Sequence, residues 1–220
     1  MVGARMKTLI RFGLGLLAWL ALAAAANDPT RFALPSSPPR FAKPSGRVLF
    51  SDDFSKGLRA WSPDRAGVWS IVRGLLRADL PDQKQQRSLI YAGDTTWTDI
   101  AVDLDVCMMR GVDKGVVVRV QGNSGLGVDL RGNDYQDVVV YQRELPMGRA
   151  SATNANGQWN HLRLELRGAA FRLFVNGELR IEREALKFIR PQGRIALPAY
   201  TGGSGQCTVY YDNVVVTALE

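Results

Sequence analysis

The amino-acid sequence predicts an all-β protein in which two antiparallel sheets stack as a jelly-roll sandwich. Three observations lead to this fold class. From residue 47 onward, short runs rich in β-branched and aromatic residues are separated by Gly, Asn and Asp. Several runs alternate strictly between apolar and polar residues, and no long stretch has the 3.6-residue period of a helix. Many short strands without helices pack as two stacked sheets.

The first 26 residues have the features of a secretory signal peptide. Arg5, Lys7 and Arg11 precede an uncharged apolar run over residues 12–26, whose last residues are Ala24-Ala25-Ala26. This run is shorter than the roughly 20 residues that a membrane-spanning helix needs. We therefore expect cleavage after residue 26, a secreted or periplasmic location, and no membrane insertion of the mature protein. An uncleaved membrane anchor is the alternative.

Residues 27–46 contain five prolines and no apolar period, which predicts an extended linker. The formal net charge of +7 is concentrated at this end of the chain, because residues 1–47 hold seven of the 28 basic residues and one of the 21 acidic residues. Residues 48–220 are therefore almost neutral, unlike a nucleic-acid-binding domain with clustered Lys and Arg. We expect one domain over residues 47–220, a solvated linker and no nucleic-acid partner. Contact of the linker with an anionic envelope surface is the alternative.

Within the domain we expect thirteen strands in chain order. They cover residues 48–50, 69–72, 75–78, 88–91, 99–108, 114–121, 125–130, 137–143, 160–167, 170–175, 178–183, 193–198 and 208–218. The pair Asn176-Gly177 separates two of them and is typical of a two-residue hairpin, because both turn positions must tolerate positive φ. One helical turn could form at residues 184–188.

Alternation assigns one face of each strand to the core. In residues 100–106 the apolar side chains fall on one face, and Asp103 and Asp105 fall on the other. These two aspartates are the nearest match to the paired carboxyls of a glycosidase, but the glutamates of such a strand are missing. In residues 160–167 three leucines oppose His161, the single histidine. We interpret all three polar residues as the solvated face of a sheet.

Two cysteines, Cys107 and Cys207, lie in strand-like runs. In a chain exported to an oxidising space, an even number of cysteines favours a disulfide. Such a bond requires the two strands to be neighbours, and two buried free thiols are the alternative. No Cys/His cluster has metal-ligand spacing. Oxygen-only Ca²⁺ binding is compatible with the many loop Asp and Asn residues, but no loop of fixed spacing identifies a site, so we expect no cofactor.

Several short motifs follow one another along residues 48–220. They are Leu49-Phe-Ser-Asp-Asp-Phe54, Trp61, Trp69, Gly74-Leu-Leu76, Trp97-Thr-Asp99, Gly115-Val-Val-Val-Arg119, Gly157-Gln-Trp-Asn160, Phe174-Val-Asn-Gly177, Gly193-Arg-Ile-Ala-Leu197 and Tyr211-Asp-Asn-Val214. Their order and spacing resemble the concanavalin A-like lectin/glucanase superfamily and, more narrowly, its 3-keto-disaccharide hydrolase-type domain, with Val where the family has aromatics before Arg119. The resemblance implies a concanavalin A-like sandwich, and this architecture hosts lectins, glycosidases and interaction modules.

In that architecture the outward face of the central sheet is concave and bears the ligand. If Val116, Val118 and Val120 point into the core, polar side chains of the central strands face outward. The candidate ligand-binding residues are Arg119, Gln121, Asp129, Tyr141 and Arg143. Arginine forks and carboxylates can bond sugar hydroxyls or a carboxylated sugar, and an aromatic ring can stack on a pyranose. An ordinary solvated face with ion pairs is the alternative.

Aromatic residues divide into two groups. Trp61, Trp69 and Trp159 fall at positions typical of packing anchors. Tyr91, Trp97 and Tyr200 lie next to glycine-containing loops, and we expect them to be exposed candidates for stacking.

The resulting hypothesis is an exported protein that binds carbohydrate on its concave face. The first alternative, implied by the resemblance, is an enzyme that cleaves glycosidic bonds of 3-keto-disaccharides, with Asp129 as acid or base and Arg119 stabilising developing charge. A 3-keto sugar requires only proton abstraction beside a carbonyl. The second alternative is a non-catalytic interaction module of the cell envelope, which would show a broad apolar patch.

Overall fold

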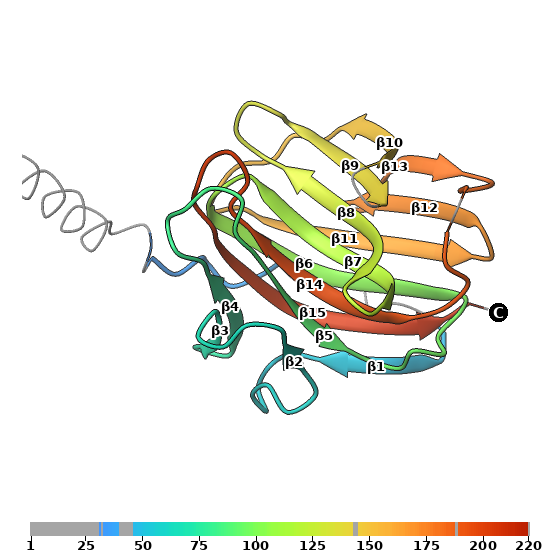
Figure 1. Ribbon diagram of the computed structural model, residues 1–220, viewed down its shortest axis with the longest axis horizontal. Coiled ribbons are helices and arrows are strands. Elements are labelled where there is room, and N and C mark those ends of the chain that lie inside the picture. The colour runs from blue at the N-terminus through green and yellow to red at the C-terminus, as the bar shows by residue number, and fades with distance from the viewer. Residues whose placement is uncertain (1–30, 32, 40–45, 143–144, 188, 220) are drawn as a thin grey trace, which may run out of the picture.

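The structure, a computed structural model, describes residues 31, 33–39, 46–142, 145–187 and 189–219. Two antiparallel sheets stack face to face. They are called sheets A and B, with the strands given below, and sheet B lies in front of sheet A in the view of Figure 1. The predicted fold class, a two-sheet antiparallel jelly-roll sandwich, is confirmed. No helix among the described residues has the length and apolar character needed to cross a membrane. The expected signal peptide lies outside the described residues.

Sheet A contains eight strands in the order β13-β12-β11-β6-β15-β4-β3, and β1 pairs with β15. Their bounds are β1 Val48–Asp52, β3 Trp69–Val72, β4 Leu75–Asp79, β6 Ile100–Arg110, β11 Trp159–Arg167, β12 Ala170–Val175, β13 Glu178–Arg183 and β15 Thr208–Ala218. Sheet B contains seven strands in the order β10-β9-β8-β7-β14-β5-β2. Their bounds are β2 Ser62–Pro63, β5 Arg87–Ala92, β7 Asp113–Gln121, β8 Ser124–Arg131, β9 Asp137–Gln142, β10 Leu145–Ser151 and β14 Arg194–Tyr200.

Each of the thirteen expected strands is present, and the sequence pattern missed two. Strand β2 is only two residues long, and β10 contains Pro146 and Gly148, which interrupt a strand-like pattern. The Asn176-Gly177 hairpin is confirmed, with φ of 53° and 84° at its two positions. Residues 184–187 form no helical turn, and residue 188 lies outside the described residues.

The core lies between the sheets, as the alternation predicted. Alternate residues of β6 from Ile100 to Met108 and of β11 from Leu162 to Leu166 contribute apolar side chains to it, and so do inward valines and leucines of β7, β8 and β9. The expectation that Asp103 and Asp105, on the opposite face of β6, are solvated is wrong. They are only 3% and 2% exposed, since charged side chains of neighbouring strands close over them.

Strand β7 departs from simple alternation at Arg119. This residue has a φ of 49°, and the pairing of β7 shifts register there with both β8 and β14. A β-bulge of this kind turns the following side chain to the other face. Val120 therefore leaves the main core and joins a small apolar cluster with Leu89, Tyr91 and Val117. The expectation that Val120 points into the core is wrong.

The predicted disulfide is absent from the structure, and both cysteines are buried free thiols. Cys207 belongs to the main core cluster. Cys107 follows Val106 on β6 and precedes Met108, both of which face the core, so its own side chain points to the outer side of sheet A. The two thiols therefore lie on opposite faces of the same sheet, which prevents a bond even though β6 and β15 are neighbours.

Candidate functional site

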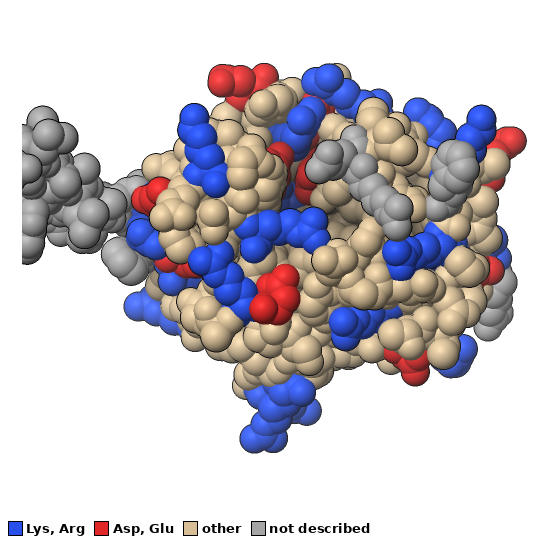
Figure 2. Space-filling view, viewed as in Figure 1, with Lys and Arg blue, Asp and Glu red and all other residues tan. Residues whose placement is uncertain are grey.

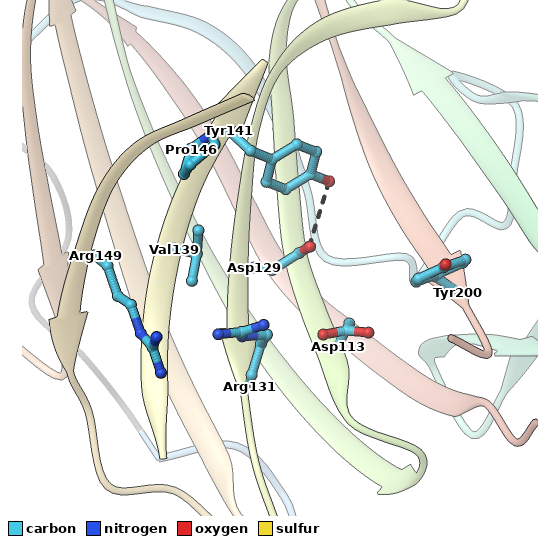
Figure 3. A pocket seen from close by; sticks show the side chains of 8 residues that line it. All are labelled: Asp113, Asp129, Arg131, Val139, Tyr141, Pro146, Arg149 and Tyr200. Atoms are coloured by element: carbon cyan, nitrogen blue, oxygen red, sulfur yellow. Dashed lines mark hydrogen bonds between the residues drawn. The ribbon is translucent and has the colours of Figure 1, made fainter. Parts of the chain in front are cut away.

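A pocket of about 380 Å³ opens on the outer face of sheet B, the side turned away from sheet A. Eight side chains from β7, β8, β9, β10 and β14 line it: Asp113, Asp129, Arg131, Val139, Tyr141, Pro146, Arg149 and Tyr200. Figure 3 shows how they surround the hollow, with Tyr141 pointing toward Asp129. On the same face, basic side chains are spread around the surface, as Figure 2 shows.

Two glycines make room for this hollow. A Cβ on Gly127 would lie 2.3 Å from the Cζ atom of Tyr141, so only glycine lets the tyrosine ring lie across β8. A Cβ on Gly115 would meet the backbone oxygen of Val128 at 1.9 Å. Both glycines occupy outward positions beside Asp129, since Gly115 pairs with it and Gly127 lies two residues before it on β8. The pocket therefore exists where outward side chains are missing.

The carboxyl of Asp129 has an unusual environment. Tyr141 donates a long hydrogen bond of 3.5 Å to its Oδ1 atom. Burial, and then the neighbouring charge of Asp113, raise the pKa of Asp129 to about 8, although Arg131 and the Tyr141 bond oppose this shift. Burial also raises the pKa of Asp113. Neither carboxyl forms an ion pair with a described residue, so the pocket holds two acids that favour protonation.

The arginines of the pocket are already engaged by one acid. Arg131 forms a two-pronged bond with Asp137 at 2.8 and 2.7 Å, and Arg149 Nε lies 2.6 Å from the same carboxylate. Burial alone would raise the pKa of Asp137, but the hydrogen bonds and charge of Arg131 lower it below its ordinary value. Two guanidinium groups share one carboxylate, so this side of the pocket retains a positive charge.

Three predicted site residues come together in the pocket, namely Asp129, Tyr141 and Tyr200. Sequence reasoning missed the other five. Asp113 and Arg131 could have been found, because each lies two residues from an outward glycine or aspartate on its strand. Pro146 and Arg149 could not, since they lie on the unpredicted strand β10.

Arg119 lies elsewhere, and its predicted convergence with Asp129 is wrong. Its guanidinium is 1% exposed and bonds the carbonyl oxygens of Thr98, Gly168 and Arg190 at 2.6–3.2 Å. It also lies 3.4 Å from Asp99. These partners precede or follow strands of both sheets, so Arg119 joins the two sheets at one end of the sandwich. The bulge at Arg119 aims the side chain there.

Three further candidates lie outside the pocket. The exposed Gln121 bonds the carbonyl of Gln192. The Trp97 ring packs against the main core, 6.4 Å from the ring of Phe50, and is not an exposed plate. Tyr91 is also buried, because the guanidinium of Arg194 covers its ring at 4.2 Å.

Arg143 lies outside the described residues, so its predicted position stays a prediction.

The outer face of sheet A carries a second polar cluster, centred on His161. The imidazole Nδ1 lies 2.8 Å from Asp105, and Nε2 lies 3.3 Å from Asp103. Arg163 and Asn213 bond the remaining oxygens of these carboxylates at 2.6 and 2.8 Å. Burial alone would lower the pKa of His161, but the two aspartates raise it to about 9. Every acid here has a cationic partner, which is typical of a structural network.

Across the described residues, no three His, Cys, Asp or Glu side chains are arranged to hold a metal ion. The second cluster has only one histidine, and its carboxylates are already bonded. The chemistry that the geometry offers is therefore that of the pocket: proton transfer by buried acids, hydrogen bonding and aromatic contact.

Comparison with solved structures identifies relatives of the fold. The carbohydrate-binding module CBM66 from Bacillus subtilis matches with a TM-score of 0.62 and 15% identity, over 74% of this chain and 98% of its own. Domain 4 of the arabinanase AbnA from Geobacillus stearothermophilus, in complex with arabinotriose, matches with 0.58 and 14%, over 80% and 96%. The β-glucanase of Bacillus licheniformis matches with 0.60 and 11%, over 80% and 100%.

At these identities the structural matches establish the shared fold alone. A comparison with curated proteins finds no significant match. The family comparison is more specific, because the sequence model of the 3-keto-alpha-glucoside-1,2-lyase-like domain matches residues 47–217, nearly the whole sandwich. This chain belongs to the family of 3-keto-alpha-glucoside-1,2-lyase-like domains.

Proposed function

We propose that this protein binds a carbohydrate in the pocket on the outer face of sheet B. The observation that carries the proposal is the carboxyl of Asp129, which lies in a pocket with Tyr141 and Tyr200 and pairs with no cation among the described residues. With a pKa of about 8, this acid is mostly neutral at pH 7. A neutral carboxyl can both donate and accept a hydrogen bond, as a sugar hydroxyl does.

The size of the pocket sets the scale of the ligand. Small-molecule sites range over roughly 300–1,000 Å³, and this cavity of about 380 Å³ lies at the lower end. It therefore suits a terminal sugar unit or a disaccharide rather than a long buried chain. Among proteins of this fold, one is named a carbohydrate-binding module and another was solved with arabinotriose, which supports a saccharide ligand.

Titration calorimetry with a panel of mono- and disaccharides, including 3-keto forms, tests this proposal. Asp129→Asn should weaken binding by about tenfold, because the amide replaces the hydroxyl donor with a different geometry. Asp134→Asn makes the same side-chain substitution at an exposed turn residue outside the pocket and should leave affinity unchanged. No binding by the folded protein to any saccharide, or equal losses in both variants, would contradict the proposal.

A second candidate function is cleavage of a 3-keto-glycoside, and the family supports it. A catalytic acid or base works best when its pKa lies near the working pH, and Asp129 meets this condition. As a carboxylate it would remove the proton from the carbon beside the keto group. The electron pair would form the double bond as the glycosidic C–O bond breaks, and the departing oxygen would take up a proton. Arg119 is too far from the pocket to assist.

Product formation distinguishes the two functions. If the protein is an enzyme, Asp129→Asn should abolish product formation from a 3-keto-disaccharide, measured by chromatography, while Asp134→Asn retains it. If the protein only binds, neither the native protein nor either variant forms product, although calorimetry still detects the ligand.

We also propose export, supported by the charged head and apolar run of residues 1–26. N-terminal sequencing of protein recovered from a bacterial periplasm should find Asn27 first. Retention of the full N-terminus would contradict cleavage.

A further inference from the structure

The N-terminal segment, defined here as residues 31 and 33–39, does not extend into solvent as a linker would. It lies against the outer face of sheet A, opposite the pocket. Arg77 donates a 2.8 Å hydrogen bond to the carbonyl of Arg31, Tyr210 donates one of 3.3 Å to that of Ala33, and Trp159 Nε1 donates one to that of Ser36. The expectation of a solvated linker therefore does not hold for these residues.

The donors form a single row across the sheet. Trp159 of β11 pairs with Cys107 of β6, Cys107 pairs with Tyr210 of β15, and Tyr210 pairs with Arg77 of β4. Strands lie about 4.8 Å apart, so the two steps from Trp159 to Tyr210 span roughly 10 Å. Three residues of a polyproline II chain, at about 3.1 Å each, span roughly 9 Å. The chain from Ala33 to Ser36 thus has the length needed to cross these strands.

Burial is uneven along the segment. Ala33, Leu34, Pro35 and Pro38 are half-buried, whereas Ser36, Ser37 and Pro39 are exposed, so the two half-buried prolines lie three residues apart. A polyproline II helix has three residues per turn, so residues three apart share one side. Aromatic donors that bond the carbonyls of a proline-containing chain are a recurring mode of peptide recognition.

An ion pair fixes the start of the segment. Arg31 Nε lies 2.9 Å from Asp79 Oδ2, at the end of β4. The contacts are thus a salt bridge at one end and hydrogen bonds to the backbone along the rest. Most of these contacts are made to backbone carbonyls and not to side chains. A different extended chain with prolines three residues apart could therefore form the same hydrogen bonds.

We propose that the row Trp159–Cys107–Tyr210–Arg77 is a binding site for an extended, proline-containing peptide, and that the N-terminal segment of this chain, residues 31 and 33–39, is its resident, exchangeable occupant. The site is separate from the pocket and does not depend on its function. A segment held mainly by backbone bonds, and continuous with the chain, can detach without unfolding the sandwich.

The labelling rates of the two cysteine thiols report on this detachment. Cys107 lies in the row, between Trp159 and Tyr210, and is fully buried. Cys207 is equally buried but belongs to the core, so only global unfolding exposes it. In the intact protein, N-ethylmaleimide should label Cys107 at least about tenfold faster than Cys207, as peptide mass spectrometry would measure, because local opening costs less than global unfolding.

Two neighbouring prolines provide matched variants. Pro38→Gly should speed the labelling of Cys107 by about two- to fivefold, because glycine loosens a half-buried docking residue. Pro39→Gly changes an exposed neighbour and should have less than about half of that effect. Labelling of Cys207 should be the same in both variants.

A synthetic peptide of residues 31–39 tests exchange. Added at millimolar concentration to the Pro38→Gly protein, it should slow Cys107 labelling toward the native rate, whereas a scrambled peptide of the same composition should not. Equal labelling rates for Cys107 and Cys207 in every variant would overturn the proposal, since the segment would then leave only on unfolding. Failure of the peptide to protect Cys107 would also overturn it.

Discussion

The outer faces of the two sheets both place aspartates two positions apart or on neighbouring strands, but they treat the carboxyls differently. On sheet A, Asp103 and Asp105 meet His161 and Arg163 at 2.6–3.3 Å. On sheet B, burial raises the pKa of both Asp113 and Asp129, and the charge of Asp113 raises that of Asp129 further. Neither carboxyl forms an ion pair with a described residue. A buried acid with cationic partners is part of the folded framework, because removing one partner leaves the other charge unpaired. An acid in a hollow without such a partner is available to a ligand.

The largest expected effect tests the sheet A side of this comparison. Asp105→Ala should lower the free energy of unfolding by about 3–5 kcal/mol, because it leaves His161 charged and partly unpaired in a buried network. Asp129→Asn should cause no comparable loss, since it removes an acid that is costly to ionise there. Urea denaturation of both variants measures the difference. Similar losses would mean that both acids are structural.

The next effect concerns pH. The folded pKa of His161 is raised to about 9 from 6.5, so its contribution to stability is fully present below pH 6.5 and is lost as pH rises through 9. Each pKa unit corresponds to about 1.4 kcal/mol, which gives a fall of about 3 kcal/mol over this range. Asp129 acts in the same direction below pH 8, so the measurement is the difference between the native protein and His161→Gln. Parallel pH profiles would refute this role.

The protonation of Asp129 on sheet B predicts that saccharide affinity depends on pH. If the ligand accepts a hydrogen bond from neutral Asp129, affinity should be constant below its pKa of about 8 and fall about tenfold per pH unit above it. Asp129→Asn should have a flat profile between pH 7 and 9. Calorimetry with the tightest saccharide provides the measurement, and an unchanged affinity at pH 9 in the native protein would exclude the neutral acid as donor.

The smallest effect separates the two arginines of the pocket. The side chain of Arg149 is 63% exposed, so Arg149→Gln should change the unfolding free energy by less than about 1 kcal/mol despite its short contact with Asp137. Arg131→Gln should cost more, because it removes a two-pronged bond to a buried carboxylate. Equal effects in thermal or urea unfolding would show that exposure does not decide the value of these pairs.

The fold was predictable because it depends on local patterns. Period-two alternation in residues such as 100–106 and 160–167 indicates which face is buried, and Asn176-Gly177 indicates a hairpin, without knowledge of any partner strand. Strand β10 escaped detection for the same reason, since Pro146 and Gly148 break the local pattern and the strand exists only because β9 pairs with it.

The site was predictable only in part. Alternation alone placed Asp129 and Tyr141 on the outer face of sheet B. It failed at Arg119, where one bulge residue with positive φ redirects the side chain to the end of the sandwich. Exposure was also misjudged, because Tyr91 is covered by Arg194 and Trp97 packs on the core, and both contacts join residues far apart in sequence.

By itself, the sequence determined the two-sheet sandwich, the order of its strands along the chain and the faces that most of them bury. Only the tertiary structure decided which polar residues meet. Pairing across strands placed His161 between two aspartates, left Asp129 beside Asp113, and separated Cys107 from Cys207 by the thickness of a sheet. The physical reason is that burial follows local periodicity, whereas the charge state of a carboxyl depends on neighbours that only strand pairing supplies.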